Sequence, residues 1–479
     1  MAEKNLKEKT AKGLFWGGFS NGVQQLLNLL FGIVLARLLT PSDYGMVGML
    51  AIFSAIAGTL QESGFMAALT NKKDITPADY NAVFWFNILV SVTAYIILFF
   101  CAPYIAAYYR QPELTALARY LFLGFVLAST SIAQSTYLFK NLMVKQKAIS
   151  QIPALLLSGT VGIIMAYNGM AYWGIATQTL VYISTISICF WYFSPWRPSW
   201  HIDLRPLKGM FGFSSKVLLT NIFTQINNNV FSAIIGRYFS PHSVGYFTQS
   251  NKWSNMGSAL ISGMISSTVQ PVLVEISDNR ERQRNVFRKL LRFTAFLSFP
   301  AMFGLALIAP EFIEITIGSK WKPCIPFLQI LCIWGAFFPL TTLYTNLIIS
   351  KGKSNIYMWN TILLGILQII AILATASHGL THMIGVFCLL NISWLLVWHF
   401  FAGREIHLSL WKAVWDILPF MASAIVTVGI TWYLTRSFTH LYGLLAAKLF
   451  TAILIYCSIM WIGKSQIFKE TLQYLRKRK

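Results

Sequence analysis

Amide side chains recur on one face of an otherwise apolar stretch near the N-terminus. Asn21, Gln25 and Asn28 lie at positions i, i+4 and i+7, a spacing that places them on the same side of a helix. A carboxamide both donates and accepts hydrogen bonds, and leaving it unpaired in an apolar medium costs several kcal/mol. This face must therefore meet polar partners on another helix or line a watery cavity.

The same stretch occurs a second time, 200 residues later and without a gap. Between positions 21 and 45 there are seven identities, where composition alone gives roughly one or two, so we infer an internal repeat. The identical pairs are Asn21/Asn221, Gln25/Gln225, Asn28/Asn228, Phe31/Phe231, Arg37/Arg237, Pro41/Pro241 and Gly45/Gly245. We expect one internal cavity flanked by two related halves.

Four cations lie in or at the edges of the repeated spans. Arg37 and Arg237 end the apolar helix of each copy, and Lys216 and Lys252 lie within the second half. Together with the amides, they suit an anion with a polar body, such as a phosphate carrying sugars. A cation exporter would instead use buried Asp or Glu, and Glu62 is the only acid that we expect clearly inside a span.

The candidate binding residues are the amides and cations of both copies. They are Asn21, Gln25, Asn28, Arg37, Lys216, Asn221, Gln225, Asn228, Arg237 and Lys252. Other interpretations stay open for each group. The arginines could anchor the helix ends at the membrane interface, Lys252 could extend its ammonium group to that interface, and the amides could join one helix to another.

The composition defines the class of protein in which these residues must be placed. With 56% hydrophobic residues, 11% charged residues and a mean hydropathy of +0.58, the chain is an all-α integral membrane protein. Fourteen apolar stretches are each long enough to cross about 30 Å of hydrocarbon as a helix. We predict spans at 13–39, 44–67, 82–107, 114–138, 149–168, 171–193, 212–238, 244–272, 290–309, 324–349, 356–377, 382–401, 415–435 and 441–463.

The repeat and the span count predict the organisation of the chain. We expect an N-terminal lobe of six spans at 1–193, a linker at 194–210 and a C-terminal lobe of six spans at 211–401. Two further spans at 402–463 have no partner copy, and a basic tail follows at 464–479. These boundaries amount to two six-helix lobes related by the repeat, plus two C-terminal helices.

The distribution of positive charge predicts the orientation. Most of the 38 Lys and Arg residues fall in the loops on the side of the N-terminus, which places both termini and the linker in the cytoplasm. The formal net charge of +22 therefore reflects topology and attraction to anionic lipids. We expect no binding of nucleic acid, because no basic soluble domain is present to carry it.

Motifs for catalysis, cofactors and metals are missing from the sequence. Gly352-Lys353-Ser354 looks like the end of a P-loop, but Leu347 stands where its first glycine is needed. The seven histidines form no HExxH motif, and the six cysteines form no CxxC motif. The loops are too short for a soluble catalytic domain. We therefore predict a protein that is not an enzyme, with no catalytic residue, no cofactor and no metal site.

Several short motifs resemble one known superfamily. ARLLTPSDYG at 36–45, ESGF at 62–65, FWFN at 84–87 and Ala102-Pro103 are similar to motifs of polysaccharide flippases in the multidrug, oligosaccharidyl-lipid and polysaccharide exporter superfamily. GSKW at 318–321 and PFLQIL at 326–331 resemble its colanic-acid-exporter branch in particular. The relatives often have Asp-x-Gly where this chain has Glu62-Ser63-Gly64, which leaves the role of that acid open.

The resemblance implies a fold and a function that composition does not show. It implies two six-helix lobes facing each other in a V, with two more helices, in a bacterial inner membrane. The implied substrate is a polyprenyl-diphosphate-linked oligosaccharide moved to the outer leaflet by alternating access, with polysaccharide polymerase machinery as a further partner. Two alternatives remain, a drug or cation antiporter of the same fold and a membrane polysaccharide polymerase or glycosyltransferase.

The predicted topology can be tested with fusion reporters. A reporter fused after Lys479 should be cytoplasmic, and one inserted between Gly169 and Tyr172 should be external, because the positively charged loops stay inside. Paired reporters that are active on opposite sides of the membrane make the measurement. An external C-terminus would require an odd number of spans and would contradict the arrangement of six plus six plus two.

Overall fold

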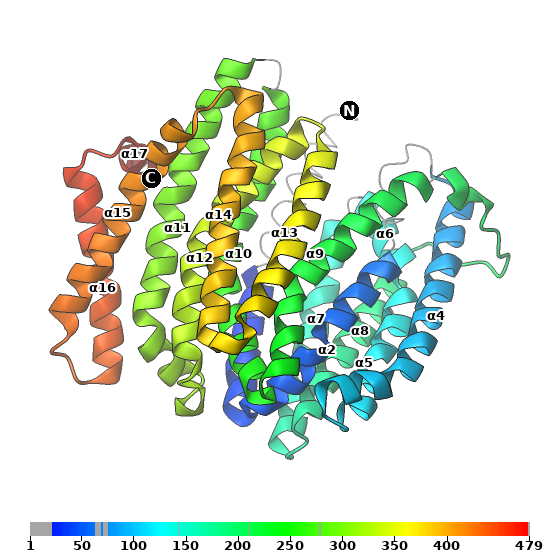
Figure 1. The fold of residues 1–479 in the computed structure, drawn as a ribbon. Coiled ribbons are helices and arrows are strands. Elements are labelled where there is room, and N and C mark those ends of the chain that lie inside the picture. The colour runs from blue at the N-terminus through cyan, green and yellow to red at the C-terminus, as the bar shows by residue number, and fades with distance from the viewer. Residues whose placement is uncertain are drawn as a thin grey trace. The chain divides into compact units, whose positions relative to one another are not determined.

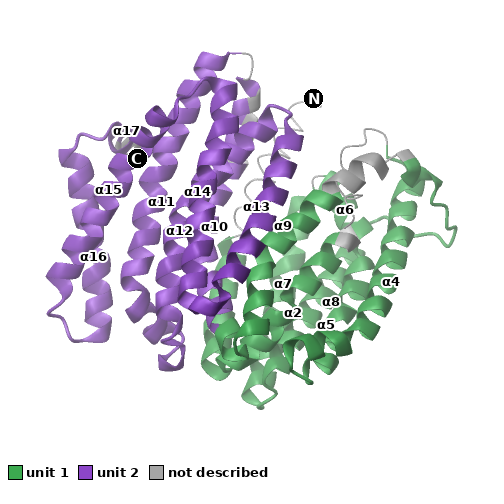
Figure 2. Ribbon diagram, in the orientation of Figure 1, with its two compact units in different colours: residues 1–245 green, residues 246–479 purple. Residues whose placement is uncertain are grey.

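The secondary structure of the chain is helical throughout the part that is described (Figure 1). The structure is a computed structural model, and it describes residues 22–62, 69, 75–141, 143–209, 211–276 and 279–477. The chain divides into two compact units, Met1–Gly245 and Tyr246–Lys479, coloured separately in Figure 2.

Unit 1 contains the N-terminal helices and the second copy of the repeat. Its elements are the helix Gly22–Leu38, α2 (Pro41–Glu62), α4 (Pro77–Tyr109), α5 (Leu114–Ser129), α6 (Ile132–Lys140), α7 (Val144–Tyr167), α8 (Tyr172–Phe193), the 3-10 helix η1 (Arg205–Gly209), α9 (Phe211–Tyr238) and the first turn of α10 (Pro241–Glu275). Within this unit α7 packs along α8, α4 along α5, and α2 along α9.

Unit 2 contains the rest of α10 and the C-terminal helices. Its other elements are α11 (Arg280–Thr316), η2 (Ser319–Trp321), α12 (Cys324–Ser350), α13 (Ser354–Thr375), η3 (Ala376–His378), α14 (Leu380–Ile406), α15 (Leu410–Thr435), α16 (Leu441–Ile462) and α17 (Gln466–Lys477). α11 is the centre of this unit, because α12, α15 and α16 all pack against it. The tail predicted at 464–479 carries the short helix α17, which contacts α11 and α16.

Within the described residues, each predicted span contains a helix or a pair of helices. Nine helices of the described residues are long and apolar enough to cross a membrane, and α5 with α6 makes a tenth as one bent span. The prediction of an all-α membrane protein is thus confirmed. The helices of the two repeat copies, Gly22–Leu38, α2, α9 and α10, are not among those nine.

Local sequence explains where two of the helices begin. α2 begins within Thr40-Pro41-Ser42-Asp43, and α4 begins within Thr76-Pro77-Ala78-Asp79. In each case the Thr precedes the helix, Pro fills the first helical position, and the Asp carboxylate accepts hydrogen bonds from the Thr backbone NH and hydroxyl at 2.7 to 3.0 Å. The second copy keeps a weaker form, in which Ser240 and Ser243 share a hydrogen bond of 3.1 Å.

The fourth span, predicted as one helix at 114–138, is bent by 43° between α5 and α6. Three consecutive hydroxyl groups lie at the break. Ser129, Thr130 and Ser131 donate to the carbonyl groups three residues earlier, at 2.7, 2.7 and 3.2 Å. These bonds compete with the regular backbone ladder and end the first helix. The span predicted at 114–138 therefore consists of two helices with a bend between them.

The two repeat copies meet through a reciprocal contact at the starts of α2 and α10. A methyl group added to Gly45 would overlap the backbone carbonyl of Pro241, and one added to Gly245 would overlap the carbonyl of Pro41. Such reciprocity is what a two-fold relation between the copies produces. Only glycine allows this approach, which gives a packing reason for the Gly in both copies.

The reciprocal contact predicts which glycines tolerate a side chain. Gly45→Ala and Gly245→Ala should each lower the free energy of unfolding by about 2 kcal/mol or more, because a fixed backbone group blocks the methyl. Gly58→Ala in α2 and Gly263→Ala in α10 are matched controls, since nothing lies within 4 Å of their methyl positions. The controls should stay within about 1 kcal/mol of the native protein. Thermal unfolding in detergent measures the stability of all four variants. Equal losses in the two test variants and the two controls would contradict the reciprocal contact.

Candidate functional site

The amides of the first copy lie on the helix Gly22–Leu38. Gln25 and Asn28 are exposed, and so are the nearby Leu26 and Leu30. The helix packs against α7 with other residues, since Gln24 donates a hydrogen bond of 2.7 Å to Gln151. Gln24 therefore supplies the contact between helices, while the repeated Gln25 is left accessible. Asn21 falls outside the described residues.

The amides of the second copy lie on α9 in the same pattern. Asn221 and Asn228 are exposed, and Gln225 is half-buried. The side chain of Asn229, which has no counterpart in the first copy, donates 2.9 Å to the backbone carbonyl of Gln225. The described amides of the two copies are thus exposed, apart from the half-buried Gln225.

The cations differ from one another in environment. Arg37 is exposed at the end of its helix, Lys252 is half-buried in α10, and the side chain of Lys216 falls outside the described residues. Arg237 is half-buried and donates 2.6 Å to the backbone carbonyl of Tyr108, with its guanidinium 5.1 Å from the centre of the Tyr108 ring. Arg237 thus joins the end of α9 to the end of α4.

This junction is reinforced by the neighbouring residues. A methyl group on Gly236 would meet Met49 and the Tyr109 ring at 2.8 and 2.9 Å, so α9 lies close against α2 and α4 here. The Tyr109 hydroxyl also donates 3.2 Å to the backbone carbonyl of Met49. Arg237 therefore has a structural role beside any contact with a ligand.

One buried ion pair was missed by the sequence reasoning. Glu311 of α11 and Lys448 of α16 are only 4% and 8% exposed, and their Oε1 and Nζ atoms are 2.6 Å apart. The expectation that Glu62 is the only acid inside a span is wrong, because α11 runs on through Pro310 to Thr316. The available signal was Lys448 within the stretch predicted at 441–463, whereas Glu311 lies beyond the span predicted at 290–309.

A second charged contact lies at the other end of α11. The buried Asp416 of α15 accepts 2.6 and 3.0 Å hydrogen bonds from Arg288, and Arg292 approaches it to 3.5 Å. Arg288 and Glu311 are about 35 Å apart along a regular helix. α15 and α16 are therefore fastened to α11 near both of its ends.

The buried charges of unit 2 are thus paired with each other. Gln368 of α13 likewise donates 3.0 Å to Asn391 of α14, so this amide pair joins two helices. Among the residues that the structure describes, no three His, Cys, Asp or Glu side chains gather to hold a metal ion. What the repeat helices offer is a set of accessible amides, which can form hydrogen bonds with a polar solute.

The fold that carries these helices is shared with solved membrane transporters. It matches the lipid II flippase MurJ in its inward closed conformation with a TM-score of 0.76, over 93% of this chain and 98% of the other, at 16% identity. It also matches an inward-facing multidrug resistance MATE family transporter of the MOP superfamily, with a TM-score of 0.65 over 80% and 94% at 17% identity. The chain therefore has the fold of multi-pass transporters of the MOP superfamily.

The sequence defines the family within this fold. A family model described as "Polysaccharide biosynthesis protein" matches residues 34–326, which is more than half of the chain. The chain belongs to this family of polysaccharide biosynthesis proteins.

Curated relatives in two bacteria cover most of the chain. The lipopolysaccharide biosynthesis protein WzxC of Escherichia coli (strain K12) is 24% identical over 74% of this chain and 72% of its own. The teichuronic acid biosynthesis protein TuaB of Bacillus subtilis (strain 168) is 23% identical over 89% and 90%.

The buried ion pair predicts a specific pattern of stability. Glu311→Leu and Lys448→Met should each lower the free energy of unfolding by about 3 kcal/mol, because each leaves an uncompensated charge in a buried site. The double variant should recover to within about 1 kcal/mol of the native protein, since it leaves neither charge behind. Thermal unfolding in detergent measures the stability of the two single variants and of the double variant. Additive losses in the double variant would contradict the pairing.

Proposed function

We propose that this protein is a flippase that moves a polyprenyl-diphosphate-linked oligosaccharide across the bacterial cytoplasmic membrane in polysaccharide biosynthesis. The observation that carries the proposal is the pair of accessible amide faces on Gly22–Leu38 and α9. Hydroxyl-rich glycans need many donors and acceptors, and carboxamides supply both. Membership of the polysaccharide biosynthesis family supports the same class of substrate.

The exposure of the amides favours ligand contact over the alternative that they join helices. Where amides of this chain do join helices, as in Gln24 with Gln151 and Gln368 with Asn391, the two side chains form a hydrogen bond with each other. Gln25, Asn28, Asn221 and Asn228 are instead accessible. For the diphosphate we propose Arg37, Lys216, Arg237 and Lys252, of which Arg237 also holds α9 to α4.

A drug or cation antiporter is the second candidate, and the pairing of the buried acids argues against it. Glu311 and Asp416 are buried, as such a transporter would need, but each is compensated by Lys or Arg at 2.6 Å. A carboxylate that already has a cationic partner attracts a second cation only weakly. A membrane polymerase or glycosyltransferase is the third candidate, and it usually needs a large catalytic outer loop. The helices here are joined by short segments in the described part of the chain.

The remaining expectations belong to the same proposal. We propose lobes at 1–193 and 211–401 that move against each other in alternating access, the linker at 194–210, and the additional helices at 402–463. Both termini, including the basic tail at 464–479, lie in the cytoplasm. Within the superfamily we propose the colanic-acid-exporter branch. The partners are the lipid-linked oligosaccharide, anionic lipids and polysaccharide polymerase machinery.

Accessibility of the amide faces can be tested with cysteines. Gln25→Cys and Gln225→Cys, in a background without native cysteines, should react with a small membrane-impermeant maleimide because they line a watery cavity. Val34→Cys is the control, since Val34 is exposed on the same helix but belongs to its apolar pattern. It should resist the reagent because lipid covers it. Mass spectrometry measures the labelling, and resistance of both test sites in an actively transporting protein would place the pathway elsewhere.

The charge of the substrate can be tested with three neutral variants. Lys216→Gln, Arg237→Gln and Lys252→Gln should each abolish export at an unchanged protein level, because losing a cation beside a desolvated phosphate costs about 2 to 5 kcal/mol. Arg436→Gln, an exposed cation outside the repeat, is the control and should retain export. Complementation of polysaccharide production in a flippase-deficient strain is the measurement. Full activity of all three variants would leave these cations as interfacial anchors.

A further inference from the structure

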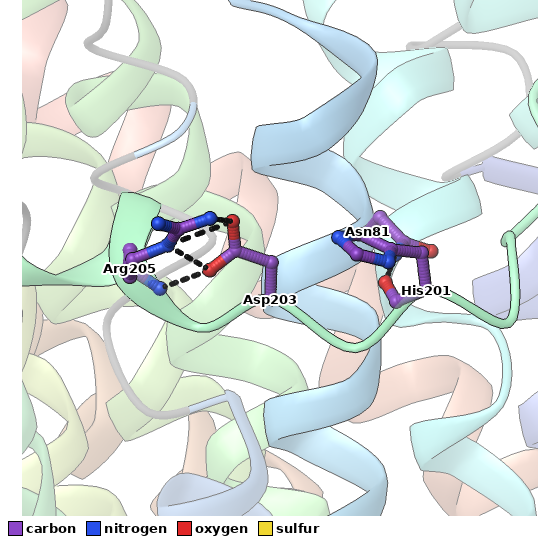
Figure 3. A network of polar contacts seen from close by, with 4 residues as sticks. All are labelled: Asn81, His201, Asp203 and Arg205. Atoms are coloured by element: carbon purple, nitrogen blue, oxygen red, sulfur yellow. Dashed lines mark hydrogen bonds and ion pairs between the residues drawn. The ribbon is translucent and has the colours of Figure 1, made fainter.

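The segment 194–209 is fastened to α4 rather than running free between α8 and α9. The carboxamide of Asn81 donates 2.6 Å to the His201 carbonyl and accepts 2.9 Å from the Ser199 NH (Figure 3 shows Asn81 beside His201). The Trp85 indole NH donates 2.8 Å to the Ser199 carbonyl. This segment, which we call the strap, therefore has a fixed backbone.

Apolar contacts hold the strap on both sides of these hydrogen bonds. Before them, the Trp196 ring packs against Tyr80 and Phe84, with ring centres 5.8 and 5.9 Å apart. After them, Leu207 is buried in a cluster with Leu69 and Tyr80. The middle of the strap is therefore held in place by contacts on both sides.

Three large apolar side chains of the strap are nevertheless exposed. Trp200, Ile202 and Leu204 occupy alternate positions and are 89%, 61% and 39% exposed. Since the backbone is fixed, they cannot turn inward to escape water. An exposed apolar surface of this kind indicates a binding partner that is itself apolar.

The charges beside these side chains are mainly positive. The only acid of the strap, Asp203, is paired with Arg205 at 2.9 Å, as Figure 3 shows. Hydrogen bonds from Arg205 hold the pKa of Asp203 at about 2, so this carboxylate stays ionised and compensated at neutral pH. Arg197, His201 and Lys208 are exposed as well. The partner that binds this surface should therefore also carry negative charge.

The ends of the neighbouring helices place the strap at a membrane surface. It begins where α8 ends at Phe193 and lies on the first turns of α4, which starts at Pro77. Both α8 and α4 are long and apolar enough to cross a membrane. A segment at the ends of two such helices lies at the level of the lipid headgroups. Exposed Trp and Lys or Arg are the residues that favour this level.

We propose that the strap is an interfacial element that binds anionic phospholipid headgroups. Trp200, Ile202 and Leu204 enter the boundary between headgroups and acyl chains, and Arg197 and Lys208 contact the lipid phosphates. The strap is thus more than a linker, because it fixes the level of α4 and α8 in the bilayer. This role rests on the proposed function in giving its anionic lipid partners a binding site, and it does not depend on the transported substrate.

Spin labels on the full-length protein test where the strap lies. Trp200→Cys and Ile202→Cys, each as the single labelled cysteine, are compared in phosphatidylglycerol nanodiscs by collision with oxygen and with a water-soluble nickel chelate. Both labels should be protected from nickel and accessible to oxygen. Glu281→Cys is the aqueous reference, and Ile97→Cys, an exposed apolar position of α4, is the hydrocarbon reference. Nickel accessibility equal to that of the Glu281 label would overturn the proposal and leave the strap free for a soluble partner.

The preference for anionic headgroups is tested with lipid quenchers. A bimane label at Ile202→Cys should be quenched more by brominated phosphatidylglycerol than by brominated phosphatidylcholine. Lys208→Gln should weaken that preference about fivefold, because one cation near an anionic surface is removed. Arg436→Gln, an exposed cation outside the strap, should leave the preference unchanged. Equal quenching by both lipids would overturn the headgroup assignment. Neither measurement depends on transport, so failure here is distinguishable from failure of the proposed function.

Discussion

Hydrocarbon cannot hydrogen-bond, and this constraint governs the placement of polar side chains throughout the chain. Some polar groups inside the helix packing meet in pairs, such as Gln24 with Gln151 and Lys448 with Glu311. Gln25 and Asn28 of the helix Gly22–Leu38 are instead accessible. A polar group that is neither paired nor buried needs water or a solute beside it. The constraint thus separates the residues that hold the protein together from those available for transport.

The same constraint explains how the C-terminal helices are attached. α15 and α16 have no counterpart in the repeat, so no two-fold relation supplies their packing. They are fastened by Asp416 and Lys448 to opposite ends of α11, and the Tyr456 hydroxyl donates 2.9 Å to the Phe296 carbonyl of that helix. Paired charges in a buried site are directional and intolerant of a missing partner. α11, α15 and α16 are therefore expected to move as one body.

The sequence predicted the features that depend on local pattern. Apolar runs marked the fourteen predicted spans, although not the helix α17 in the tail, and the offset of 200 residues identified Pro41, Gly45 and their copies. It did not predict the ion pair between Glu311 and Lys448, because these residues are 137 positions apart and only the packing of α11 on α16 brings them together. The bend after α5 was missed because it depends on which carbonyl each hydroxyl selects. The exposure of each amide could not be predicted from the sequence either, because Gln24 and Gln25 are the same residue type and differ only in their neighbours in the fold.

The reciprocal contact of Gly45 with Pro241, and of Gly245 with Pro41, has a consequence for genetics. The group that excludes a side chain at each glycine is a main-chain carbonyl, which every amino acid possesses. No replacement of Pro241 can therefore make room for a methyl at position 45. A suppressor of such a defect must shift a whole helix, so it should map to residues along α2, α9 or α10 and never to the contacting proline. Position 45 would then show no pairwise covariation with position 241, nor position 245 with position 41, although each pair is in contact.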